Sequence, residues 1–297
     1  MKFSMHNWMR PEPLEVTVER LARYGYDAIE LMGEPDKYEP EATRAILKKH
    51  GIECSGTVSL MTRDRDLTHA DPKCRQATVA YLCRCLELAE ALGGEVMCIV
   101  PTEVGHLQFY ASAEQCWEWA VEGLKRVADT ARKCKVRIGL EPLNRFETRF
   151  LNRGEQAMEL ARAVGEDVGV TLDTFHMNIE EDDAARTIRN AGSMLVDFHL
   201  GDSNRRPPGQ GHVDWKAIFG ALKGIGYDGP VASEFVNPID YTPTARKPTV
   251  WHTEVPSIEG VPPEQLKFIM DLGSGILTAE DYDLAVKQTI EFVKGLL

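Results

Sequence analysis

The chain is poor in positive charge and has no long apolar run. Its 297 residues include 34 Lys and Arg against 46 Asp and Glu, which gives a formal net charge of -12. A surplus of negative charge repels the phosphate backbone of a nucleic acid. A transmembrane helix needs about 20 consecutive apolar residues, and the sequence contains no such segment. We therefore expect neither a nucleic-acid partner nor a membrane-bound protein.

Cysteine is missing from the second half of the chain. All seven cysteines lie between Cys54 and Cys134, and an odd number of them does not form a disulfide framework. Cys83 and Cys85 are two residues apart in a helical pattern, so their side chains diverge and do not make a zinc motif. The first residues, MKFSMHNWMRPEP, lack the apolar core of a signal peptide. These features predict reduced thiols and a cytoplasmic protein.

Short apolar segments rich in β-branched residues alternate with longer helical patterns along the whole chain. Helices are expected between these segments, for example at 14–24, 73–92, 114–133, 155–164 and 215–225. Eight strands, each followed by a helix and apolar enough to be buried on both faces, indicate an α/β fold. We predict a (β/α)₈ TIM barrel that forms a single domain over residues 1–297. The expected strands are 3–8, 28–32, 53–59, 96–101, 137–143, 169–175, 195–200 and 231–235.

Two points add to this predicted barrel, an alternative fold and a long insertion. A doubly wound open sheet is the alternative, but the turn after the first strand, HNWMRPEP, has no glycine. A dinucleotide-binding or P-loop site would have a glycine-rich turn there. A long insertion at about 237–277 separates the eighth strand from the last helix. Loops of this length are often lids or interfaces, so we expect a homo-oligomer or other assembly that uses this segment.

Four polar side chains lie at the ends of four consecutive expected strands. In a (β/α)₈ barrel these strand ends meet at one rim. Each residue alone has a simpler explanation, because a carboxylate can cap the next helix and a histidine can be a hydrogen-bonded core residue. Together they form an oxygen-rich set suited to a divalent ion, Mn²⁺, Mg²⁺ or Co²⁺. The four residues are Glu141, Asp173, His199 and Glu234.

The second half of the chain resembles the xylose-isomerase-like barrels, and within them the ketose 3-epimerases of the tagatose and allulose type. The similar segments are GLEPLNRFE at 139–147, LDTFHMNIEE at 172–181, FHLGDSNRRPPGQGHVDW at 198–215 and SEF at 233–235. The resemblance implies a metal, with Mn²⁺ as the expected ion, on Glu141, Asp173, His199 and Glu234. It also implies that Glu147, His176 and Arg205 contact the oxygens of a small carbohydrate substrate.

The chemistry explains such a residue set. A divalent metal at the carbonyl stabilises an enediolate, so that a neighbouring carbon can release its proton. Glu141 and Glu234 could each bind the metal through one oxygen and keep the other free. One carboxylate on each face of the substrate could then remove and return the proton. This arrangement inverts one carbon, and it predicts a ketose 3-epimerase.

Further residues have two interpretations each. Trp8 and His6, near the end of the first strand, could bind substrate, although barrel packing would explain them nearly as well. Glu147 could instead pair with Arg145 or Arg149 at the surface. Likewise, His176 could serve packing, and Arg205 could be a loop cation exposed to water.

Other activities remain open at this stage. Aldose–ketose isomerisation begins with the same proton abstraction, as does a lyase reaction on a 3-keto C-glycoside or a 2-keto-polyol. An endonuclease IV-like repair enzyme is a remote alternative, because it needs histidines after strands three and four. Those ends read Thr57-Val58-Ser59 and Val100-Pro101-Thr102. A binding protein without catalysis gives no reason to gather three carboxylates and a histidine.

Overall fold

The computed structural model describes residues 1–62, 64–238, 253–254 and 274–297. Eight parallel strands form one sheet in the order β1-β8-β7-β6-β5-β4-β3-β2. The backbone N–H of Asp27 donates to the carbonyl of Phe3 at 2.9 Å, and a parallel bridge joins His6 to Glu30. These contacts bring β2 back to β1 and close the sheet into the expected (β/α)₈ barrel. The strands are β1 (Lys2–Met5), β2 (Ala28–Gly33), β3 (Glu53–Ser59), β4 (Val96–Ile99), β5 (Arg137–Leu140), β6 (Val168–Asp173), β7 (Leu195–Leu200) and β8 (Pro230–Ser233).

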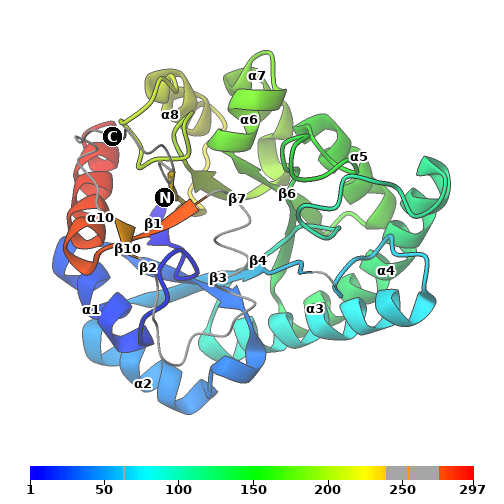
Figure 1. The fold of residues 1–297 in the computed structure, drawn as a ribbon, viewed down its shortest axis with the longest axis horizontal. Helices are drawn as coiled ribbons and strands as arrows, with labels where there is room; N and C mark the ends of the chain where they lie inside the picture. Colours follow the sequence, from blue (N-terminus) through cyan, green and yellow to red (C-terminus); the bar gives the residue numbers. More distant parts are fainter. Residues whose placement is uncertain (63, 239–252, 255–273) are drawn as a thin grey trace.

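The helices surround the strands (Figure 1). They begin at side-chain caps such as Asp71, Ser112 and Asp214, each of which accepts a hydrogen bond from the first turn. Gly25 and Gly51 end two of them with a left-handed backbone, at φ 77° and 68°. The helices are α1 (Leu14–Tyr24), α2 (Pro40–His50), α3 (Pro72–Leu92), α4 (Ala113–Cys134), α5 (Gly154–Val164), α6 (Thr174–Glu180), α7 (Ala184–Ala191), α8 (Trp215–Gly224) and α10 (Ala279–Lys294), with short 3₁₀ turns at Pro35–Lys37 and Gly192–Met194.

The expected boundaries of β3, β7 and α1 agree with the structure, whereas several strands end earlier than expected. β5 stops at Leu140 and β8 at Ser233. The chain leaves the sheet there, although its side chains remain buried in the upper part of the barrel. Apolar content continues past the last strand hydrogen bond, so composition alone overestimates the strand length.

Only parts of the expected insertion at 237–277 are described. β9 (Asn237–Pro238), β10 (Thr253–Glu254) and β11 (Ser274–Leu277) form a small antiparallel sheet in the order β10-β11-β9. The other residues of the segment lie outside the described part of the chain. After β11, helix α10 packs beside α1, where the Tyr26 hydroxyl donates to the carbonyl of Val286 at 2.9 Å.

The interior of the barrel is unusually polar below its upper rim. Side chains two residues apart on a strand point to the same side, so Asp197 lies beneath His199 and Thr171 beneath Asp173. Both lower residues are fully buried. Gly139 makes room between these strands, because a Cβ there would lie 2.2 Å from the Thr171 hydroxyl. The barrel therefore supports its rim with polar groups.

Candidate active site

The four residues expected to bind a metal converge in the structure. Glu141 and Glu234 directly follow β5 and β8, Asp173 ends β6, and His199 lies in β7. All four are buried, and one ligand atom from each lies within 4.8 Å of the others. His199 Nδ1 is 3.2 Å from a Glu141 oxygen and 3.6 Å from a Glu234 oxygen. The consecutive strands β5 to β8 thus bring three carboxylates and one imidazole to one point.

Burial makes it costly for the carboxyl groups of this cluster to be ionised. It raises the pKa of Asp173 to about 6, and repulsion by Glu141 contributes to that rise. The pKa of Glu234 is raised to about 7, first by burial and then by Asp173. Charged carboxylates in such a place need a nearby cation. The donor set, with oxygen from three carboxylates and nitrogen from one imidazole, fits a divalent ion such as Mn²⁺.

Glu141 differs from Glu234. Burial would raise the pKa of Glu141, but the contacts with His199 outweigh burial and lower the pKa below its ordinary value. The Cys98 thiol also donates to the second oxygen of Glu141 at 3.2 Å. Without a bound cation, the surroundings therefore lower the pKa of Glu141 and raise that of Glu234. Two carboxyl groups with separated pKa values can act as base and acid.

Asp173 serves two purposes at once. One of its oxygens accepts hydrogen bonds from the backbone N–H groups of Phe175 and His176, at 2.5 and 3.4 Å, and so caps helix α6. The simple interpretation of this carboxylate as a helix cap is therefore correct. This cap does not prevent Asp173 from also binding a cation in the cluster. The cap holds the carboxylate in place through one oxygen, and the second oxygen is not part of the cap.

Arg205 joins the cluster to a second polar group. Its guanidinium donates to Glu147 at 2.7 Å and to Glu234 at 3.4 Å, and it lies over the Phe175 ring. The side chain is only 11% exposed, so it is not a loop cation in water. Arg145 pairs with Glu180 at 2.8 Å, which leaves Glu147 to Arg205.

His176 is held in one orientation beside this pair. Its Nδ1 accepts from the backbone N–H of Asn144 at 3.2 Å, so the proton of the neutral ring lies on Nε2. The Asn144 side chain also donates to Glu147 at 2.9 Å. Burial lowers the pKa of His176, and this favours the neutral ring. The ring can therefore donate one hydrogen bond from Nε2.

The loop between β7 and α8 positions Arg205. Asp202 accepts from the backbone of Gly209 and Val213, at 2.8 and 3.2 Å, and from the indole of Trp215 at 3.1 Å. Arg205 itself has φ 59°, a left-handed backbone that is uncommon for a residue other than glycine. Its carbonyl accepts from Val236 N–H at 2.8 Å. A network around one buried carboxylate thus holds a strained backbone at the site.

A cavity opens above the cluster. Its described lining has a polar part, made of Glu141, Glu147, His176, Arg205 and Glu234. The rest of the lining is apolar apart from the Ser59 hydroxyl, and it consists of Trp8, Val58, Ser59, Leu60, Val100, Val104 and Leu143. The cavity therefore offers proton-transfer groups on one side and a shaped wall on the other.

Trp8 and His6 have different places. Trp8 lines the cavity, and its indole N–H donates to His6 Nδ1 at 3.0 Å. His6 is fully buried behind it and does not belong to the described lining, so its position does not favour the expected substrate contact. Its ring instead meets His199 edge-on, with 4.5 Å between the ring centroids.

Three buried groups around the cluster, Asp197, Cys98 and Glu30, are not among the site residues expected from the sequence. Asp197 Oδ2 lies 3.0 Å from His199 Nε2, on the side of the ring away from the cluster. Glu30 is fully buried beside it, and burial followed by repulsion from Asp197 raises its pKa to about 7. The available signal was the spacing of two residues between Asp197 and His199 on one strand.

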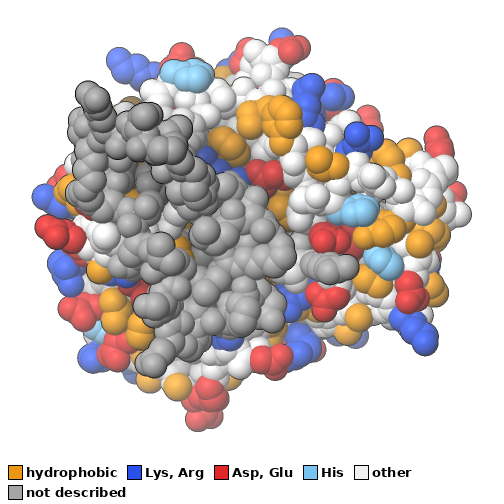
Figure 2. Space-filling view, viewed as in Figure 1, with side chains coloured by type: hydrophobic (Ala, Val, Ile, Leu, Met, Phe, Trp, Pro, Cys, Tyr) orange, Lys and Arg blue, Asp and Glu red, His pale blue; other side chains and the backbone are white. Residues whose placement is uncertain are grey.

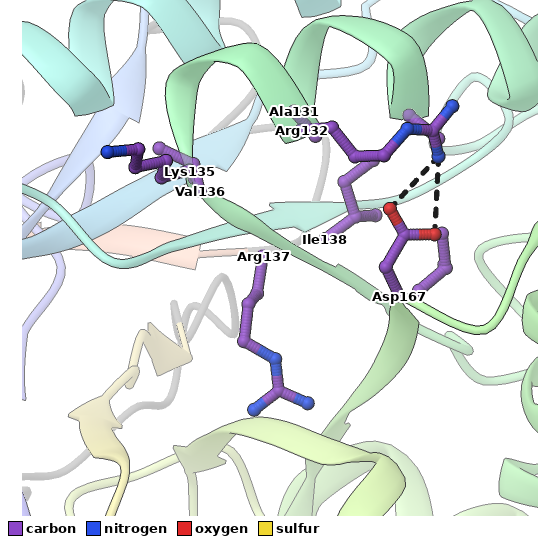
Figure 3. Close-up of a pocket in the computed structure, with 9 residues that line it drawn as sticks. Ala131, Arg132, Lys135, Val136, Arg137, Ile138 and Asp167 are labelled. Carbon is purple, nitrogen blue, oxygen red and sulfur yellow. Dashed lines mark hydrogen bonds and ion pairs between the residues drawn. The ribbon is translucent and has the colours of Figure 1, made fainter.

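A second hollow lies at the opposite end of β5 and β6, between those strands and the end of α4 (Figure 3). Arg132 pairs with Asp167 there at 2.9 Å. Lys135 and Arg137 point away from that pair and from each other (Figure 3). Its cations do not converge on a common point, so this hollow is not the candidate site.

The face that Figure 2 displays carries charges of both signs on its described residues. Lys and Arg are interspersed with Asp and Glu over the described residues of this face (Figure 2). Among the helices that the structure describes, none is long and apolar enough to cross a lipid bilayer.

Known proteins resemble this chain over most of its length. The model of the family described as "Xylose isomerase-like TIM barrel" matches residues 18–272. D-psicose 3-epimerase of Ruminiclostridium cellulolyticum is 34% identical over 226 residues, which are 73% of this chain and 76% of that protein. Ketose 3-epimerase of Arthrobacter globiformis is 30% identical over 91% of this chain and 94% of its own.

A solved structure resembles the whole chain. D-psicose 3-epimerase with D-tagatose from Clostridium cellulolyticum H10 superposes with a TM-score of 0.83 at 25% identity. The match covers 100% of this chain and 99% of the other. Sequence and structure thus agree on the same group of enzymes. The chain belongs to the xylose isomerase-like TIM barrel family and is a sugar epimerase or isomerase related to the ketose 3-epimerases.

Proposed function

We propose that this protein is a divalent-metal-dependent epimerase that inverts C3 of an unphosphorylated ketose. The observation that carries the proposal is the pair Glu141 and Glu234, two buried carboxyl groups that line one cavity and belong to the same four-residue cluster. An epimerase without a covalent intermediate needs such a pair, one group to remove a proton and one to return it.

The metal site of this proposal consists of Glu141, Asp173, Glu234 and His199 through Nδ1. Mn²⁺ is the proposed ion, and Mg²⁺ or Co²⁺ would suit the same donors. A bound divalent cation supplies positive charge beside the substrate carbonyl, which makes the neighbouring C–H acidic. The raised pKa values of Asp173 and Glu234 support a cation at this point.

The proton transfer uses the difference between the two carboxyl groups. Ionised Glu141 takes the proton from C3 on one face of the substrate, and Glu234 gives a proton to C3 on the other face. The configuration at C3 then inverts. Because the reverse reaction exchanges the two roles, each group must pass through both protonation states during a complete equilibrium.

Other cavity residues hold the substrate. His176 donates from Nε2 to a substrate oxygen, and Arg205 stabilises the negative charge that develops when the proton leaves. Glu147 orients Arg205 and accepts from a hydroxyl group, while Trp8 provides a flat apolar wall. Within the described lining Arg205 is the sole cation, and its guanidinium already contacts two carboxylates. This supports a free ketose such as D-psicose over a sugar phosphate.

The proposal extends to the setting of the protein. All seven cysteines are free, which supports a reducing, cytoplasmic location. One domain over residues 1–297 and a homo-oligomer formed through residues 237–277 remain predictions, since most of that segment lies outside the described residues.

The test is deuterium exchange. Metal-loaded protein is incubated in D₂O with D-psicose or D-fructose, the protein and metal are removed, and the sugars are analysed by NMR. Deuterium at C3 together with the C3 epimer is the expected result, and protein treated with a chelator is the control. Exchange at C1 with an aldose product would instead indicate an isomerase. Release of an aglycone from a 3-keto C-glycoside, without ketose exchange, would identify a lyase.

A further inference from the structure

His199 lies between two groups of carboxylates. Its Nδ1 faces Glu141 and Glu234 at 3.2 and 3.6 Å. Its Nε2 faces the barrel interior, where Asp197 Oδ2 lies at 3.0 Å and Glu30 Oε2 at 3.7 Å. An imidazole that binds a cation through one nitrogen must carry its proton on the other. Which ring nitrogen carries this proton therefore decides whether His199 can bind a cation through Nδ1.

Asp197 is built to hold that proton. It is fully buried and lies two residues before His199 on β7. Its first oxygen accepts from the backbone N–H of Phe198 at 2.9 Å, which fixes the rotation of the carboxylate. Its second oxygen is then directed at His199 Nε2 at an ordinary hydrogen-bond distance.

Glu30 cannot replace Asp197 in this role. Its oxygen is 3.7 Å from His199 Nε2 and 3.6 Å from His6 Nε2, and both distances exceed that of a hydrogen bond. Neither Glu30 oxygen has a hydrogen-bond partner among the described residues. The edge-on His6 ring limits the tilt of His199 but contributes no acceptor for its Nε2 proton, because His6 Nδ1 is occupied by Trp8.

We infer that Asp197 is a positioning residue, which fixes His199 as the Nε2–H tautomer and thereby presents the bare Nδ1 to the cation. The inference rests on the proposed metal site. Without this acceptor, the buried Nε2–H would lose its partner, and the ring would gain no advantage from keeping its proton there. A proton on Nδ1 would then compete directly with the cation.

The first experiment measures cation affinity without substrate. Asp197→Asn keeps the shape of the side chain, but its amide can donate to a bare Nε2 and so favour the wrong tautomer. Loss of such a supporting group typically weakens metal binding by about 10- to 100-fold, and we expect this loss for Mn²⁺ in competition with a fluorescent chelator. Asp66→Asn is the matched control. Asp66 is also buried, but it lies in the loop after β3 and contacts Thr68 and the backbone of Glu103, so Mn²⁺ affinity should stay at the wild-type value.

A second measurement needs no variant at Asp197. Protein with ¹⁵N-labelled histidine and bound Mg²⁺ is examined by long-range ¹H–¹⁵N NMR, and the His199 signals are assigned by their loss in His199→Gln. The expected pattern has a proton on Nε2 and none on Nδ1. A proton on Nδ1 in the loaded protein, or wild-type Mn²⁺ affinity in folded Asp197→Asn, would overturn the inference.

These outcomes are distinct from failure of the proposed function. Tight Mn²⁺ binding that weakens in Asp197→Asn, with no exchange at C3 of any ketose, would contradict the epimerase and support the positioning role. Normal epimerisation combined with unchanged affinity in the variant would contradict the positioning role alone.

Discussion

The two sides of the cavity are built differently. The strands β5 to β8 and their loops supply the side chains that can move protons or carry charge, among them Glu141, Arg205 and Glu234. From β1 to β4 come Trp8, Val100 and other apolar groups, with Ser59 as the polar exception in the described lining. In the proposed mechanism, one side of the barrel therefore supplies the reacting groups, and the other shapes the space for the substrate.

The largest effect is expected on the reactive side. Glu141→Gln removes the proposed base and one ligand charge while keeping the shape of the side chain. Deuterium exchange at C3 should fall by roughly a thousandfold, in the range typical for loss of a general base. The exposed substitution Glu122→Gln on α4 is the matched control and should leave the rate unchanged. Exchange at the wild-type rate in folded, metal-loaded Glu141→Gln would remove Glu141 from the mechanism.

A smaller loss is expected at Arg205. Arg205→Met keeps much of the side-chain length but leaves Glu147 and Glu234 without their buried partner. We expect kcat/KM for D-psicose to fall about 100-fold, since loss of one charged partner in a buried site costs a few kcal/mol. Arg206→Met, one residue along the same loop, should stay close to the wild-type value. Equal effects of both substitutions would mean that kcat/KM depends on the positive charge of the loop as a whole and not on the specific contacts of Arg205.

When no metal is bound, the buried carboxyl groups on the reactive side should also destabilise the folded protein. The folded-state pKa values of Glu234 and Glu30 are raised to about 7, and that of Asp173 to about 6. Between about pH 4.5 and 7 these three carboxyl groups hold more protons in the folded state than in the unfolded state, so their contribution to the free energy of unfolding falls as pH rises. The lowered pKa values of the buried His6 and His176 act in the opposite direction. Urea unfolding of chelator-treated protein at a series of pH values should show this fall.

Two comparisons sharpen the pH prediction. Glu234→Gln removes one raised carboxyl group and should make the pH dependence weaker. Saturating Mn²⁺ should reverse the trend, because the ion binds the ionised carboxylates. An identical pH dependence in metal-free wild-type protein and Glu234→Gln would show that the Glu234 carboxyl group is already ionised without a cation.

The smallest change is expected on the apolar side. Val100→Ala enlarges the cavity wall without touching the reactive groups. The relative kcat/KM for longer and shorter ketoses should change by about tenfold, the lower end of the roughly 10- to 200-fold that one methylene is worth in a pocket. Val96→Ala, on the strand β4 that precedes Val100, lies outside the lining and should alter stability without changing this ratio. A large drop in the rate of deuterium exchange for Val100→Ala would show that the apolar side of the cavity also contributes to proton transfer.

The barrel and the four-residue cluster could be predicted from the sequence for a simple physical reason. Parallel strands place their carboxyl ends at one rim, so polar residues that end apolar runs must meet there. Glu141, Asp173, His199 and Glu234 all end such runs, and each stands out against its apolar neighbours. The pattern required no knowledge of loop structure.

The supporting groups could not be predicted in the same way. Asp197 and Cys98 lie inside strands, where a cysteine resembles an ordinary core residue and a single aspartate has no visible partner. The choice of Arg205 over Arg145 as the partner of Glu147 depends on the path of the loop from Asp202 to Trp215. Such contacts arise from tertiary packing, which a local pattern does not encode.

The backbone of Arg205 has a consequence for protein engineering. At φ 59° a residue with a Cβ costs about 1 kcal/mol more than glycine. Arg205→Gly would relieve this strain, but it would also leave the buried carboxylates of Glu147 and Glu234 without their cation, which costs a few kcal/mol. Attempts to make this protein more robust should therefore leave position 205 fixed, because the contacts of the guanidinium outweigh the backbone strain at this residue.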